Sequence, residues 1–204
     1  EIGSGLVGSE MCIRDSGYLD QQSTLEAGKT IREVLRTAFN DMYEAEKQML
    51  ELYDKMAEAA PEEIDKMMNT VGEIQTELEH SGFYSLDTKI EEVANGLGLG
   101  SIGLDRDVSE LSGGQRSKVL LTKLLLQNSS ILLLDEPTNY LDVEHIEWLT
   151  RFLQNYEHAF ILISHDIAFL NQVVNVIYHL ENCELTRYTG NYDKFQEMYA
   201  IYKA

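Results

Sequence analysis

The sequence predicts an α/β fold with a mostly parallel sheet and an inserted α-helical hairpin. Residues 131–134 and 159–163 are unbroken apolar runs of strand length, which is typical of strands buried on both faces of a parallel sheet. Two carboxylates, Asp135 and Glu136, directly follow the first run. Residues 30–80 instead repeat apolar side chains at helical spacing. We therefore expect an α/β core with carboxylates at the end of a strand, where such folds place phosphate chemistry.

The composition excludes several classes of protein. The 204 residues include 16 basic and 35 acidic side chains, and the net charge of −19 opposes a general attraction to nucleic acid or to an anionic membrane. The two cysteines, Cys12 and Cys183, form no CxxC motif, so neither a disulfide framework nor a zinc site is expected. No apolar run is long enough to span a bilayer, and no segment has a signal-peptide pattern. These observations predict a cytoplasmic protein without membrane insertion.

Residues 1–16 differ from the rest of the chain. They are rich in glycine and serine and show no clear periodicity. Gly3 and Gly8 have the spacing of the phosphate-binding loop GxxxxGK[ST], but Ser9 and Glu10 stand where the lysine and the hydroxyl are required. A glutamate there would repel the phosphates. The stretch resembles a translated sequencing adapter, so we expect it to be non-native and the true phosphate-binding loop to be missing.

Residues 17–27 begin the native chain in this interpretation. The segment from Gly17 to Asp20 predicts a strand, which Gln21 follows directly. Gln22 remains open as the alternative for the glutamine that ends this strand.

Residues 28–110 predict a helical subdomain. Thr30 and Glu33 form a capping box at a helix start. Two apolar stripes follow, divided by Pro61 and ended by His80-Ser81-Gly82. The first stripe comprises Ile31, Val34, Leu35, Ala38, Phe39, Met42, Met49, Leu50, Leu52, Tyr53 and Met56 and continues to Ala60; the second comprises Ile64, Met67, Met68, Val71, Ile74 and Leu78. Two long amphipathic helices joined at a proline predict an antiparallel hairpin with these stripes as its core.

The predicted hairpin is strongly acidic. Residues 41–79 hold twelve carboxylates against three lysines, a net charge of −9. Such a charge run is usually a solvated face, and here it also limits the partners. The hairpin should not bind a phosphate backbone, but it could contact a basic protein.

A further helix is expected from Asp87 or Thr88, and a glycine-rich stretch, residues 96–103, follows it. That stretch follows a helix rather than a strand, so it fails the context of a dinucleotide-binding loop. We interpret it as the turn that leads to the next motif, Leu111 to Gln115. In that motif two adjacent glycines precede a helical run, and free N–H groups at a helix start are suited to bind an anion.

The last third of the chain alternates helices and strands. The pattern predicts helices over residues 143–156, 167–172 and 192–203 and late strands over residues 173–180 and 185–188.

Four motifs in this order resemble the nucleotide-binding domain of ATP-binding cassette (ABC) proteins. They are LSGGQ at residues 111–115, ILLLDEP at 131–137, TNYLD at 138–142 and ISHD at 163–166. The resemblance implies a partial P-loop NTPase (ABC) core with ATP and Mg²⁺ as cofactors. It also implies that this core lacks the Walker A loop.

The resemblance implies a role for each matching residue. Asp135 would hold Mg²⁺, Glu136 would be the general base, and His165 would be the switch histidine at the γ-phosphate. Gln21, or Gln22, would be the Q-loop glutamine that reaches Mg²⁺ and the attacking water. These residues form the cassette's own site.

The remaining matches face an opposing cassette. By resemblance, Ser112, Gly113 and Gly114, with Gln115 in the same motif, would bind the ATP that the opposing cassette holds. Asp142 would be the D-loop aspartate that crosses the interface between the two cassettes.

Three features resemble one branch of the family, the first cassette of a bacterial, short-arm ABC-F protein. They are TNYLD, the long helical insert, and the tail RYTGNYDKFQEMYAIYK at residues 187–203. The resemblance covers residues 17–204 and implies four parts: a Q-loop part of the core (17–27), the helical subdomain (28–110), the rest of the core (111–188) and the start of an inter-cassette linker helix (189–204).

The implied partners are a second cassette of the same full-length chain and the ribosome, with a ribosomal protein favoured over rRNA at the acidic arm. The full-length protein would hydrolyse ATP, whereas this chain alone would be inactive. The alternative is the ATP-binding subunit of a membrane ABC transporter, which would lack the tail helix and have a shorter helical region.

Overall fold

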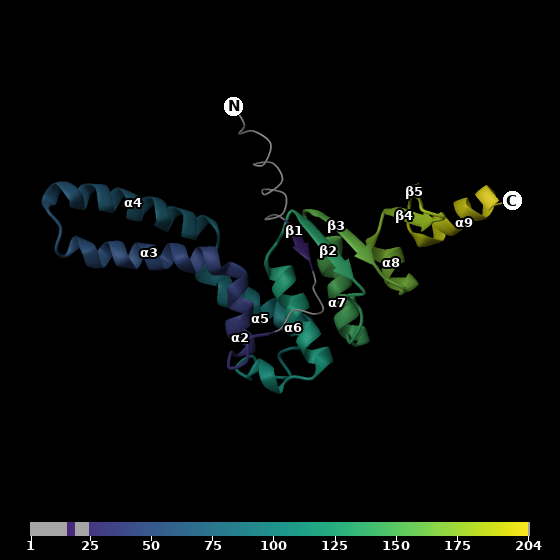
Figure 1. Cartoon of the computed structure of the whole chain (residues 1–204), viewed down its shortest axis with the longest axis horizontal. Helices are drawn as coiled ribbons and strands as arrows, with labels where there is room; N and C mark the ends of the chain where they lie inside the picture. Colours follow the sequence, from purple (N-terminus) through teal and green to yellow (C-terminus); the bar gives the residue numbers. More distant parts are fainter. Residues whose placement is uncertain (1–15, 19–24, 204) are drawn as a thin grey trace, which may run out of the picture.

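A computed structural model describes residues 16–18 and 25–203 (Figure 1). Its central element is a parallel sheet in the order β1-β2-β3, made of β1 (Ser16–Tyr18), β2 (Ile131–Asp135) and β3 (Ala159–Ile163). The last pair of the β2–β3 register joins Asp135 to Ile163, so both strands end at the same edge. The predicted α/β class with a mostly parallel sheet is confirmed.

One face of this sheet forms the core. Leu132 and Leu134 of β2 are fully buried in a cluster with side chains of α6 (Gly113–Leu126) and α7 (Val143–Gln154). On the other face, Ile161 and Ile163 of β3 are each 60% exposed. The prediction that both apolar strands are buried on two faces is therefore wrong for the described part of the chain. Apolar runs show that a strand can be buried on both faces, but the described helices cover only one.

The helical subdomain begins as predicted. Thr30 caps α2 (Ile31–Arg36) through a capping box with Glu33. The predicted continuous helix is interrupted, because a 3₁₀ helix, η1 (Thr37–Phe39), separates α2 from α3 (Asn40–Met56). The helix also ends at Met56 rather than at Ala60.

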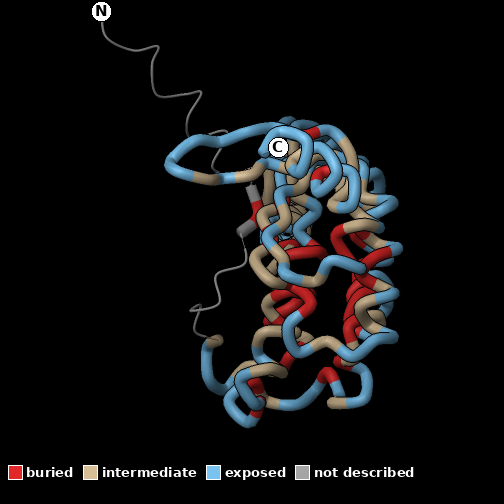
Figure 2. Tube along the Cα trace, turned by 90° about the vertical axis from the view of Figure 1, so that its right-hand side faces the viewer, coloured by how far each residue is buried: buried red, intermediate tan, exposed pale blue. Residues whose placement is uncertain are grey.

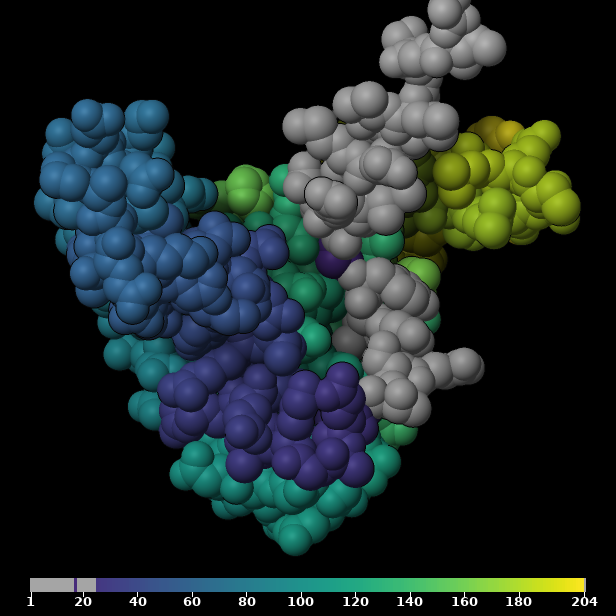
Figure 3. All heavy atoms as spheres, turned by 60° about the vertical axis from the view of Figure 1, so that its left-hand side comes forward, coloured from purple at the N-terminus to yellow at the C-terminus, as the bar shows by residue number. Residues whose placement is uncertain are grey.

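The predicted antiparallel hairpin is confirmed. α4 (Pro61–His80) starts with Pro61 in its first turn and runs back beside α3 (Figure 1). We call α3 and α4 the arm. In the space-filling view the arm forms a projecting lobe (Figure 3). No residue of α3 within Asn40–Met56 is buried, and α4 buries only Val71 and Leu78. Buried residues gather instead in the body of the molecule (Figure 2).

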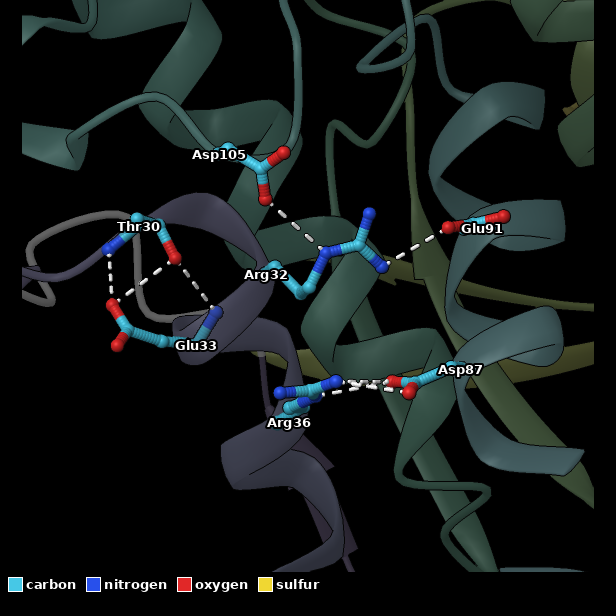
Figure 4. Close-up of polar contacts among 7 residues, drawn as sticks. All are labelled: Thr30, Arg32, Glu33, Arg36, Asp87, Glu91 and Asp105. Atoms are coloured by element: carbon cyan, nitrogen blue, oxygen red, sulfur yellow. Dashed lines mark hydrogen bonds and ion pairs between the residues drawn. The ribbon is translucent and has the colours of Figure 1, made fainter. Parts of the chain in front are cut away.

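Ion pairs tie α2 to α5 (Leu86–Gly96), which follows a second 3₁₀ helix, η2 (Phe83–Ser85). Arg36 makes a bidentate contact with Asp87, with both Nη2–O distances at 2.9 Å. Arg32 bridges Glu91 at 3.0 Å and Asp105 at 3.4 Å (Figure 4). These contacts hold α2 against the loop that leads, through η3 (Val108–Glu110), to the LSGGQ segment.

The end of the chain forms a smaller unit. α8 (Ile167–Val173) leads into an antiparallel pair, β4 (Val176–Glu181) and β5 (Glu184–Thr189), followed by α9 (Tyr192–Lys203). α9 is fastened to β4 because Tyr199 and Lys203 donate hydrogen bonds to the Glu181 carboxylate at 2.8 and 2.9 Å. Both late strands and the last helix are confirmed. The first strand starts at Val176 rather than at residue 173, because α8 extends to that position.

Candidate functional site

The carboxyl end of β2 places Asp135 and Glu136 at the edge of the sheet. Glu136 has φ of +46°, an uncommon value for a residue other than glycine. Its backbone N–H donates to the carbonyl of Ile163 at 2.8 Å. This bond fastens the loop after β2 to the end of β3, so the segments that follow the two strands lie together.

Glu136 and His165 form a direct pair. The Glu136 Oε2 atom lies 2.8 Å from His165 Nδ1 and accepts a hydrogen bond from the His165 backbone N–H at 3.3 Å. The hydrogen bond to Glu136, and then the negative charge of Glu136, raise the pKa of His165, because both favour the imidazolium. The histidine side chain is 76% exposed and the glutamate 24%, so a ligand in solvent can reach the pair.

The segment 112–115, which we call the signature turn, begins α6. Ser112 is the N-cap: its Oγ accepts from Gln115 N at 3.3 Å, and its own N–H donates to Gln115 Oε1 at 3.0 Å. This capping box was not predicted, although the sequence contains its pattern, a serine followed three residues later by a glutamine. Apart from the chain neighbours of Gly113 and the adjacent helix backbone, no atom of the described residues lies within 4 Å of the position that a Cβ would take there. An anion could therefore approach the start of the helix there.

Asp142 is the N-cap of α7, without a capping bond from its side chain. Its carboxylate is 82% exposed and lies 3.9 Å from His145 Nε2. The other ring nitrogen of His145 lies 3.1 Å from the carbonyl oxygen of Gly96. Asp142 is thus positioned at the surface with its carboxylate available to a partner.

The structure brings some predicted residues together and separates others. Glu136 and His165 touch, and Asp135 directly precedes Glu136. Among the described residues, no hydrogen bond or ion pair joins the signature turn to Glu136, His165 or Asp142. Gln21, Gln22 and residues 1–15 lie outside the described residues. Ser16, the last residue of the stretch predicted to be non-native (1–16), is described and pairs with Ile131 as the first residue of β1.

Sequence reasoning missed one neighbour of these residues, Tyr140. It lines a pocket together with Ser117, Lys118 and Glu136, between α6 and the loop after β2. Its ring lies against Gly114, so it links two motifs that the sequence treats separately. No sequence signal marks this contact, because it depends on how the loop packs.

The carboxylates at the end of β2 fit a Mg²⁺ ion that is coordinated jointly by the protein and by a phosphate ligand. Within residues 16–18 and 25–203, no group of three or more His, Cys, Asp or Glu residues could hold a metal by itself. Mg²⁺ commonly takes one or two carboxylates and fills its other positions with phosphate oxygens and water. Asp135, a partly exposed carboxylate at a strand end, suits that arrangement.

These features define an ABC-type ATPase domain: a parallel sheet, two carboxylates at the end of its middle strand, and a glycine-rich helix start. The family model described as "ABC transporter" matches residues 9–139, and the chain belongs to this family. Solved structures agree. The chain resembles the "Structure of ATP binding subunit of ABC transporter" with a TM-score of 0.62 at 17% identity, covering 97% of this chain and 67% of the other. It resembles "RNase-L Inhibitor" with a TM-score of 0.55 at 20% identity, covering 91% and 30%. The P-loop NTPase fold of the ABC type is therefore confirmed.

Curated relatives are longer than this chain. The "Uncharacterized ABC transporter ATP-binding protein YfmM" of Bacillus subtilis is 61% identical over 92% of this chain and 36% of its own length. The "Energy-dependent translational throttle protein EttA" of Mycobacterium tuberculosis is 36% identical over 89% of this chain and 32% of its length. EttA of Escherichia coli K12 is 35% identical over 89% and 32%. The chain thus spans about a third of each relative. No helix in the described segments is long and apolar enough to cross a membrane.

Proposed function

We propose that this chain is the first cassette of an ABC-F type ATPase, which binds and hydrolyses ATP between two cassettes. The observation that carries the proposal is the Glu136–His165 pair at the carboxyl end of β2, beside Asp135. ATP hydrolysis needs a positioned base, a contact to the γ-phosphate and a magnesium ligand, and these three residue types supply them.

Each residue has a role that its position allows. Glu136 accepts the proton of the attacking water through its partly exposed carboxylate. His165, held by Glu136 and open to solvent, presents its other ring nitrogen to the γ-phosphate. Asp135 would hold Mg²⁺, which when bound neutralises phosphate charge. Gln21, or Gln22, would complete this site.

The signature turn serves the second site. Ser112, Gly113 and Gly114 would bind the ATP held by the opposing cassette, and Gln115 supports them through the capping box. The exposed Asp142 would cross to that cassette. The opposing cassette would lie in the same full-length chain, with residues 189–204 as the start of the linker.

The chain by itself should be inactive. We infer that residues 1–16 do not form a phosphate-binding loop, because Ser9 and Glu10 stand where the lysine and the hydroxyl are required. Equilibrium titration with Mg-ATP should then show no binding tighter than about 1 mM, which corresponds to about −4 kcal/mol. Micromolar binding would contradict this account of the N-terminal residues.

The ABC-F assignment rests on the relatives and on the arm. Two relatives at 35–36% identity are named as energy-dependent translational throttle proteins. The arm and α9 correspond to two of the three sequence features that resemble ABC-F cassettes, the long helical insert and the tail. We infer that the full-length protein is cytoplasmic and acts on the ribosome, with the acidic arm contacting a basic ribosomal protein rather than rRNA.

The test of the ATPase role is Glu136→Gln in the full-length protein. Removing a general base should lower ATP turnover by roughly 10²- to 10⁴-fold, while ATP binding is retained. Glu157→Gln, at an exposed position before β3, is the matched control and should keep wild-type turnover. Turnover of Glu136→Gln within about threefold of wild type would rule out the assignment.

A separate experiment tests the partner. The full-length Glu136→Gln protein, held in its ATP-bound form, should co-sediment with ribosomes in the presence of ATP. Recovery with membranes and not with ribosomes would favour the transporter-subunit alternative.

A further inference from the structure

The loop after β2 is held in one conformation. Glu136 N donates to Ile163 O at 2.8 Å, and Asn139 N donates back to Glu136 O at 3.2 Å. Leu141 N closes a second turn by donating to Thr138 O at 3.1 Å, and Thr138 is buried. The loop is therefore fixed to the ends of β2 and β3, and a shift of Glu136 must carry the loop with it.

Tyr140 lies in this loop in a conformation that ordinary packing does not explain. Its φ is +66°, which is uncommon for a bulky side chain. Its side chain is 67% exposed, and its hydroxyl makes no hydrogen bond to any described residue. A strained backbone and an exposed ring are retained where the surroundings hold them, and such outliers cluster at functional sites.

The ring of Tyr140 lies directly against the signature turn. A Cβ placed on Gly114 would lie 3.0, 3.2 and 3.3 Å from Cδ1, Cγ and Cβ of Tyr140. These distances are tighter than most Cβ contacts, so a side chain larger than hydrogen at position 114 would require Tyr140 to move by a few tenths of an ångström. Tyr140 therefore packs closely against the first turn of α6.

A continuous path of contacts follows. His165 bonds to Glu136, the Glu136 loop carries Tyr140, and Tyr140 contacts Gly114. In the proposed function, Glu136 acts on the ATP of this cassette, while Gly114 binds the ATP of the opposing one. The path thus joins the two sites within one chain.

We propose that Tyr140 is a positioning residue that holds the signature turn in register with the Glu136 loop and so couples the two ATP sites. The coupling rests on the proposed function, whereas the contact between Tyr140 and Gly114 does not. The two claims can therefore be tested apart.

The first experiment measures the contact in this chain. Tyr140→Asn removes the ring and tolerates the positive φ, because asparagine visits the left-handed region readily. Tyr140→Phe keeps the ring and is the matched control. Amide hydrogen exchange of residues 113–117 should accelerate by about fivefold or more in the asparagine variant and stay unchanged in the phenylalanine variant. Equal exchange in both variants would overturn the positioning role.

The second experiment measures the coupling in the full-length protein. Tyr140→Asn should lower kcat by about tenfold, because the signature turn that Tyr140 holds in register completes the opposing ATP site in the proposed function. A merely structural role would instead lower the melting temperature and leave kcat per folded molecule unchanged, and that result would overturn the coupling.

A failure of the proposed function can be distinguished from a failure of the positioning role. If Glu136→Gln kept wild-type turnover while Tyr140→Asn still loosened the signature turn, the catalytic assignment would be lost and the positioning role would stand.

Discussion

At the residue scale, the predicted site depends on two side chains that follow different strands. The sequence places Glu136 and His165 after apolar runs, and parallel pairing of β2 and β3 brings them to 2.8 Å. The pairing could be predicted because parallel strands end at one edge. The positive φ of Glu136 and of Tyr140 could not, because neither residue type favours that conformation.

The Glu136–His165 pair predicts a specific titration. The pKa of His165 should be raised above its ordinary value, and Glu136→Gln should lower it, because the neutral amide no longer stabilises the imidazolium. Since the folded-state pKa is raised, the stabilisation is fully present below the unfolded-state pKa and is lost as pH rises through the folded value. The measurement is an NMR titration of this chain with the other four histidines as internal controls. A His165 pKa unchanged by the substitution would show that the pair does not form in solution.

The turn between β4 and β5 predicts a stabilising substitution. Asn182 and Cys183 both have positive φ, +52° and +64°, as a two-residue hairpin turn of type I′ requires. Cysteine is disfavoured there and glycine is not, so Cys183→Gly should stabilise the fold by up to about 1 kcal/mol in urea unfolding. Cys183→Ser removes the thiol and keeps the strain, so it should change little. Equal stabilities of the two variants would contradict the argument.

At the scale of elements, most helices and strands follow from periodicity, and the misplaced boundaries have identifiable causes. The break at Thr37–Phe39 escaped prediction because a 3₁₀ turn keeps apolar residues three apart, much as an α-helix does. Tertiary packing decides it: Phe39 is buried in the body, whereas α3 leads out into the arm. The start of α2 was predictable because the capping box is a purely local device.

That cap gives a prediction for α2. Thr30 Oγ1 accepts from Glu33 N at 3.2 Å, and the Glu33 carboxylate accepts from Thr30 N at 2.7 Å. Thr30→Ala should therefore lower the free energy of unfolding by about 1 kcal/mol in urea titration. Thr70→Ala, in the exposed middle of α4, is the matched control and should cost less than about 0.5 kcal/mol. Equal losses at the two positions would show that the cap contributes nothing.

At the scale of the whole molecule, the body and the arm differ in composition: the body buries apolar side chains, whereas the arm is acidic and mostly exposed. The body buries one continuous apolar cluster beneath one face of the sheet, and the sequence could predict its class but not which face remains exposed. An apolar run shows which residues can be buried. It does not show which segment will pack against them, because that depends on the tertiary structure. The arm carries nearly half of the net charge of −19 and adds little to this cluster.

The arm can therefore be shortened without unfolding the body. Met49 of α3 and Ile74 of α4 are the outermost arm residues that pack against the core cluster. Replacing residues 50–73 by a short glycine-serine linker removes seven carboxylates and two lysines and leaves the cluster intact. The melting temperature of this chain should then change by no more than about 4 °C, the effect of about 1 kcal/mol in a domain of this size.

The same deletion tests the proposed ribosome contact. In the full-length protein it should abolish co-sedimentation with ribosomes, because the proposed contact with a basic protein is removed. A full-length variant that keeps residues 50–73 but exchanges their seven carboxylates for glutamine should keep the fold and also lose binding, if charge is what the partner recognises. Binding retained by both variants would remove the arm from the proposed interface.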